Sequence, residues 1–144
     1  MATEADFIAL ARDSFKADGS VDMDKGDLLW SALFKLPEWY FLMTPQSKAN
    51  GALAAQLIDE KVWFLAFTDP EKLRFYATRN RNLDETGNAL FVTMKPMEAV
   101  EFARDSLHLS VYGVRFNEAQ EHGWFSPLEN LTKFPDYLQE KGLV

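Results

Sequence analysis

The two histidines of the chain are the first candidates for a metal site or for acid–base chemistry. His122 lies near Glu118 and Glu121, and a histidine beside carboxylates could contribute ligands to zinc. His108 lies in a separate predicted loop. A zinc ion needs several converging ligands, whereas these residues offer one weak pair. We therefore expect both histidines to be solvated surface residues, and we predict no metal site.

A second candidate is a run of alternating oxygen-bearing side chains: Asp18, Ser20, Asp22 and Asp24. Such spacing resembles the start of an EF-hand calcium loop, which also requires glycine at its sixth position and glutamate at its twelfth. Counted from Asp18, those positions hold Met23 and Leu29. The motif fails, and an acidic helix N-terminus that favours the helix dipole explains these residues better.

Motifs for covalent catalysis or phosphate binding are missing from the sequence. It contains no Gly-x-Ser-x-Gly, no Gly-x-Gly-x-x-Gly and no Walker-type loop. Glu98 and Glu101 lie three residues apart on one predicted helix, whereas an acid–base pair normally faces across a cleft. We predict no catalytic residue and no cofactor.

A basic stretch with one aromatic residue suggests nucleic-acid binding, through Lys72, Arg74, Tyr76, Arg79 and Arg81. Such a group could neutralise a strand and stack on its bases. Three acidic residues dilute it: Glu71, Asp84 and Glu85. A charged helix face is the favoured interpretation.

The aromatic residues are the most informative candidates for a site. Trp39, Trp63, Trp124 and Phe125 are difficult to assign to one core, and Trp124-Phe125 follows a predicted loop. Exposed aromatic side chains are enriched in protein interfaces. We predict an interaction surface that includes Trp39, Tyr40, Trp124 and Phe125. Burial of the Trp-Phe pair beneath the last helix remains the alternative.

Composition limits the class of protein. The chain has 144 residues, no cysteine and 47% hydrophobic residues, which indicates one folded domain without a disulfide scaffold. Its formal net charge of −7 disfavours binding to nucleic acid or to anionic membranes. The N-terminus lacks signal-peptide features, and no apolar stretch of about 18 residues exists. We expect a cytoplasmic protein.

Hydrophobic periodicity predicts alternating helices and strands. Expected helices cover residues 4–17, 24–35, 70–80, 96–107, 127–131 and 133–141. Expected strands cover residues 39–44, 53–58, 61–67, 89–94 and 112–116, with a polar turn at 46–51 and either strand or loop at 123–126. Asp69 and Pro70 give the clearest local pattern, an N-cap followed by proline in the first turn.

These elements predict an α+β fold with a mixed five-stranded sheet, in which strand 61–67 lies in the middle. The first three strands should form an antiparallel meander, and the last three should pair in parallel through helical crossovers. We divide the single domain into an N-terminal helical segment (1–36), a sheet core (37–131) and a C-terminal helix (132–144).

Three segments, 36–41, 64–73 and 111–117, resemble the SseB N-terminal-domain family, named for an enhanced serine sensitivity protein. The second is the most telling, because it joins a strand ending in Phe67-Thr68 to the helix that follows. The resemblance spans residues 36–131, about two-thirds of the chain. It implies the same fold and carries over no catalytic residue.

The sequence favours a non-enzymatic protein–protein interaction module with an unidentified partner, a second copy of the chain being one alternative. A second hypothesis is an acidic secretion chaperone or immunity-type protein that masks a partner. A third is an enzyme or small-molecule sensor with a site that no motif reveals.

Overall fold

A computed structural model describes residues 4–16, 18–118 and 123–143 of the chain, and side chains from Phe7 onward. The helices are α1 (Glu4–Ser14), α2 (Met23–Phe34), α3 (Pro45–Ala49), α4 (Pro70–Arg79), α5 (Pro96–Asp105), α6 (Leu128–Leu131) and α7 (Phe134–Glu140). The strands are β1 (Trp39–Met43), β2 (Ala55–Ile58), β3 (Lys61–Phe67), β4 (Leu90–Met94), β5 (Gly113–Phe116) and β6 (Trp124–Pro127). The predicted α+β class is confirmed. None of the helices in the described ranges is long and apolar enough to span a membrane.

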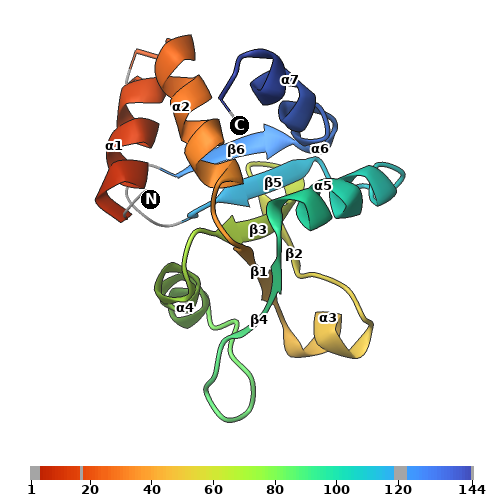
Figure 1. Ribbon diagram of the computed structural model, residues 1–144. Coiled ribbons are helices and arrows are strands. Elements are labelled where there is room, and N and C mark those ends of the chain that lie inside the picture. The colour runs from red at the N-terminus through yellow and green to blue at the C-terminus, as the bar shows by residue number, and fades with distance from the viewer. Residues whose placement is uncertain (1–3, 17, 119–122, 144) are drawn as a thin grey trace.

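The strands form one mixed sheet in the order β4-β1-β3-β5-β6, and β2 pairs with β3 outside this path (Figure 1). Only the β3–β5 pair is parallel among the named strands. One edge of β3 is therefore occupied by β5. Two strands share its other edge. The first half of β3, from Lys61 to Phe64, pairs with β2, and its end, at Ala66 and Phe67, pairs with β1.

This pairing corrects three details of the predicted sheet. It has six strands, because residues 124–127 form β6. The antiparallel pairing of β2 with β3 is confirmed, but the predicted pairing of β1 with β2 is wrong, because β1 lies between β4 and β3. The parallel pairing of strand 90–94 is also wrong. Both edges of β3 are already occupied, so β4 pairs antiparallel with β1 at the sheet edge.

Residues 45–49 form the short helix α3 where a polar turn was expected. Thr44 caps this helix, because its side chain accepts a hydrogen bond from the Ser47 backbone N–H at 3.1 Å. The Ser47 side chain in turn accepts one from the Thr44 N–H at 2.8 Å. This reciprocal capping box, with Pro45 at the first helical position, starts a helix.

Side chains alternate across β3 and divide the core into two clusters. Phe64 and Ala66 face the side covered by α1, α2, α5, α6 and α7, which we call the helix-covered face. Trp63, Leu65 and Phe67 face the opposite side, which we call the α4 face because α4 packs there on β1 and β3. The position of β3 in the middle of the sheet is confirmed.

The carboxyl ends of the two parallel strands are joined by hydrogen bonds. Asn117, just after β5, is buried and has φ of 53°. Its side-chain oxygen accepts a hydrogen bond from the Thr68 backbone N–H at 3.0 Å. The next residue, Asp69, caps α4 by accepting from the Lys72 backbone N–H at 2.9 Å and pairs with the buried Lys72 ammonium at 2.7 Å. The predicted start of this helix at Pro70 is confirmed.

Candidate functional site

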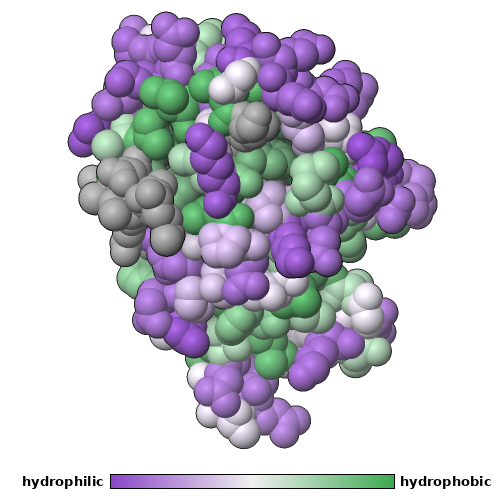
Figure 2. Space-filling view, in the orientation of Figure 1, coloured by the Kyte–Doolittle hydropathy of each residue, from purple (hydrophilic) through white to green (hydrophobic). Residues whose placement is uncertain are grey.

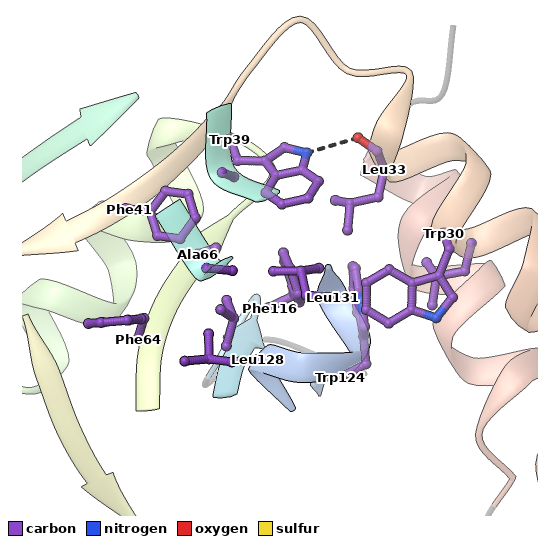
Figure 3. Packing of buried hydrophobic residues seen from close by; sticks show 14 of the residues in the cluster. Trp30, Leu33, Trp39, Phe41, Phe64, Ala66, Phe116, Trp124, Leu128 and Leu131 are labelled. Atoms are coloured by element: carbon purple, nitrogen blue, oxygen red, sulfur yellow. Dashed lines mark hydrogen bonds between the residues drawn. The ribbon is translucent and has the colours of Figure 1, made fainter. Parts of the chain in front are cut away.

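The structure places two of the predicted surface residues, Trp39 and Trp124, in the core of the helix-covered face. Trp39 is 0% exposed, and its indole N–H donates a hydrogen bond to the Leu33 carbonyl at 2.8 Å (Figure 3). Trp124 is stacked between Phe7 and Phe116, with ring centroids 6.2 and 5.6 Å away. Neither tryptophan can contribute to an interaction surface, so this part of the expectation needs correction. Because successive side chains of a strand point to opposite faces, Trp39 on β1 and Trp124 on β6 both point to the helix-covered face.

The other two predicted residues, Tyr40 and Phe125, lie on the α4 face but not together. Tyr40 is on β1 and half-buried, with its ring 5.7 Å from that of Phe91. Phe125 is on β6 and 51% exposed. Strands β3 and β5 lie between them. The structure therefore does not bring the four predicted residues into one site, and Phe125 is the one with a large exposed area.

Phe125 belongs to a group of side chains that the sequence did not identify. Its ring lies 5.2 Å from that of the buried Trp63 in an edge-to-face arrangement, and the Trp63 ring lies 5.0 Å from that of Tyr112. The Arg115 guanidinium lies 4.9 Å from the Trp63 ring, and the Lys61 ammonium lies 4.1 Å from the Tyr112 ring. We call these five residues the aromatic–cationic patch.

Strand pairing explains why the patch forms. Arg115 on β5 is directly opposite Phe125 on β6 and beside Leu65 on β3, so all three point to the α4 face. Gly113 lets β6 approach closely, because an added Cβ there would overlap the Ser126 carbonyl oxygen. The sequence indicates that successive side chains of β5 point to opposite faces of the sheet. It does not show which strands lie beside β5, and so it could not bring Arg115 together with Phe125.

The patch carries charges of both signs. The Arg115 guanidinium pairs with Glu118 at 2.8 Å and reaches Asp59 at 3.4 Å. Nearby on the same face, burial raises the pKa of the Tyr76 hydroxyl above its usual value, Glu118 raises it further, and Arg115 opposes the change. Cations held over aromatic rings are attracted by about 0.5–2 kcal/mol each, depending on solvent exposure.

The patch lies beside a free sheet edge. Strand β6 is the last in the strand order and pairs with β5 alone among the described strands. No other described strand occupies its outer edge, although Pro127 at its end has no backbone N–H to donate. Unpaired edges are where many proteins bind extended segments. Phe125 sits in this edge strand, so the exposed ring and the unpaired edge belong to one surface.

The remaining sequence candidates have structural explanations. Asp18 accepts hydrogen bonds from the Ser20 hydroxyl and backbone N–H, at 2.6 and 2.9 Å, and these bonds lower the pKa of its carboxyl group. Asp22 caps α2. In the basic stretch, Lys72 is buried, and Arg74 pairs with Glu71.

The two glutamates on α5, which were considered for acid–base chemistry and set aside, also have local partners. Glu98 accepts a hydrogen bond from the Lys95 backbone N–H, and Glu101 pairs with Arg104. His108 is exposed in the segment after α5, and His122 with Glu121 lies outside the described residues. In the described ranges, no three His, Asp or Glu residues are grouped to hold a metal ion.

A pocket on the other side of the molecule was also not anticipated from the sequence. An open pocket of about 310 Å³ lies among the α1–α2 connection, α2 and the α7 region, and its walls are mostly apolar. Hydrophobic surface is visible between the hydrophilic side chains over these helices, at the top of the view (Figure 2). We call it the α2–α7 pocket.

No protein-family model matches this sequence, and no curated protein is significantly similar to it. The resemblance to the SseB N-terminal-domain family therefore stays a prediction from the three sequence segments.

Proposed function

We propose that this protein is a non-enzymatic protein-interaction module that binds through the aromatic–cationic patch and the free edge of β6. The observation that carries the proposal is the exposure of Phe125 and Tyr112, which are 51% and 41% exposed over a base of Trp63 and Arg115. Aromatic residues and arginine are the types most enriched in interface hot spots.

We further propose that one partner is a second copy of the same chain. Because Arg115 lies close to Asp59 and Glu118 and Lys61 adds a second cation over Tyr112, the patch carries both signs of charge and can be complementary to itself under two-fold symmetry. An antiparallel β6–β6 pairing would extend the sheet by the same symmetry. The net charge of −7 opposes association, but physiological salt screens charges more than about 8 Å apart.

Sedimentation equilibrium of the full chain at physiological ionic strength tests this proposal. We expect a reversible monomer–dimer equilibrium. Phe125→Ser should weaken it by about 2 kcal/mol, or roughly thirty-fold, because the substitution removes the exposed centre of the patch.

Leu57→Ser is the matched control. Leu57 is more exposed than Phe125, at 73%, but it pairs with Val62 and so points to the opposite face of the sheet. It should leave the equilibrium unchanged. A wild-type protein that stays monomeric at every concentration would rule out self-association. Equal weakening by both variants would show that general hydrophobicity, and not the patch, drives it.

A further inference from the structure

The α2–α7 pocket is built from two walls of different origin. After α1 ends, Phe15 and Val21 pair as an antiparallel bridge, and Gly19 allows the tight turn between them with φ of 87°. This places their exposed apolar side chains at the pocket. The opposite wall comes from Phe134 and Tyr137 of α7.

The inner part of the pocket is aromatic. Trp30, which is buried, lines it, and its ring stacks on that of Phe134 with a centroid separation of 4.2 Å. On the side away from the pocket, Trp30 packs edge-to-face on Phe116 (Figure 3). The core therefore holds the indole in place, and the pocket does not depend on one mobile side chain.

Gly26 is the most informative residue of the pocket. It is buried within α2, where glycine is less favourable than alanine. Apart from the neighbouring backbone of the helix itself, no atom lies within 4 Å of the position that a Cβ would take, and the backbone is helical. Neither close packing nor backbone conformation requires glycine here. What its missing side chain provides is open space, because Gly26 lines the pocket.

One carboxylate gives the pocket its chemical character. Asp27 is half-buried and lines the pocket, and its two oxygens accept the Tyr137 hydroxyl at 2.9 and 3.1 Å. This hydrogen bond raises the pKa of the Tyr137 hydroxyl. Within the described residues, no cation pairs with Asp27, whereas Lys133 at the rim is directed to Glu129 at 3.4 Å. The carboxylate retains lone pairs for another donor.

We infer that the α2–α7 pocket binds a small organic amine with a flat apolar body. The apolar body would occupy the space left by Gly26, between Trp30 and Phe15. The ammonium group would donate to Asp27 and lie against the aromatic rings, which attract cations. The volume of about 310 Å³ is at the lower end of small-molecule sites, roughly 300–1,000 Å³, and such sites combine apolar walls with few polar groups.

The test uses tryptamine as the probe, titrated into the ¹⁵N-labelled full chain. The four tryptophan indole N–H signals report where it binds. We expect the Trp30 signal to shift in a saturable manner and those of Trp39, Trp63 and Trp124 to stay in place. Indole-3-propionate, which has a carboxylate in place of the ammonium, should bind at least about tenfold more weakly, because a charge-assisted hydrogen bond is replaced by repulsion.

Two pairs of variants separate the pocket from its surroundings. Gly26→Leu should abolish the Trp30 shift by filling the space, whereas Gly26→Ala should stay folded with a higher melting temperature. Asp27→Asn should weaken tryptamine binding at least about tenfold. Asp24→Asn makes the same charge change at an exposed position of α2 and should leave binding unchanged.

Three outcomes would overturn the inference. The first is no saturable Trp30 shift with tryptamine. The second is a shift that persists in Gly26→Leu. The third is tighter binding of indole-3-propionate than of tryptamine, which would assign the polar end to an anion. Self-association is measured by sedimentation and amine binding by titration. A failure of the amine-binding inference is therefore distinguishable from a failure of the proposed self-association.

Discussion

Trp39 and Phe125 lie on opposite faces of the same sheet, and their surroundings differ. Trp39 packs edge-to-face on Phe34 and Phe116 and has no exposed area. Phe125 contacts Trp63 and Arg115 and leaves half of its surface in solvent. The helix-covered face therefore uses aromatic rings to fill a core, whereas the α4 face leaves some of them available beside β6. Aromatic content alone does not distinguish these two uses.

The largest expected difference between the faces is in stability. Trp39→Ala should lower the free energy of unfolding by about 3–5 kcal/mol, because it opens a cavity and leaves the Leu33 carbonyl without its indole donor. Phe125→Ala should cost less than about 1 kcal/mol, because the ring is half exposed. Urea unfolding of both variants measures the difference. Equal losses would remove the distinction between a core face and an open face.

Gly113→Ala tests whether β6 couples the two faces. The added Cβ would overlap the Ser126 carbonyl oxygen and lie 2.9 Å from the Pro127 Cα. Strand β6, which carries Trp124 on one face and Phe125 on the other, must therefore shift. We expect a loss of about 1–3 kcal/mol in urea unfolding. Faster amide exchange should accompany it in β5 and β6, and wild-type exchange there would show that the strands do not need this close approach.

Gly26→Ala provides the opposite result at a second buried glycine. No atom obstructs the new methyl group, and alanine is the better helix former, so the free energy of unfolding should rise by about 0.5–1 kcal/mol. Urea unfolding measures it beside Gly113→Ala. Destabilisation would mean that the space at Gly26 is needed for folding, and that it is not kept open for a ligand.

The smallest expected effect is a change in the pH dependence of stability. It compares a buried tyrosine of the α4 face, Tyr76, with an exposed one, Tyr112. Because burial raises the pKa of Tyr76 above 10.0, the folded protein holds this proton more tightly than the unfolded chain. The resulting stability is fully present below about pH 10 and is lost as the pH rises through the folded pKa. Tyr76→Phe should reduce this alkaline loss in urea unfolding. Tyr112→Phe, at an exposed position, is the control, and an identical loss in both variants would contradict the assignment.

Local patterns predicted much of the fold but little of the site. The segment from Lys61 to Arg79 was predicted well, because a buried strand, an N-cap at Asp69 and Pro70 are all local features. Helix α3 was missed because residues 46–51 were interpreted as a polar turn after strand 39–44, whereas Pro45 between them favours the first turn of a helix.

Strand partners could not be predicted, because they depend on contacts between distant segments. The place of β4 beside β1 follows from the occupancy of both edges of β3, which no local pattern shows. The burial of Trp124 depends on Phe7, more than a hundred residues away in the chain. The aromatic–cationic patch likewise joins β3, β5 and β6, so only the three-dimensional arrangement could identify Lys61, Tyr112 and Arg115.

The most direct test of the central claim is a concentration series of ¹H–¹⁵N spectra from micromolar to near-millimolar protein. If the chain pairs through the aromatic–cationic patch and the edge of β6, the amide signals of Phe125, Arg115 and Tyr112 will shift together with concentration. Those of Leu57 on the opposite face will stay in place. Patch signals that do not change over the whole range would contradict self-association through this surface, as would shifts centred on the helix-covered face.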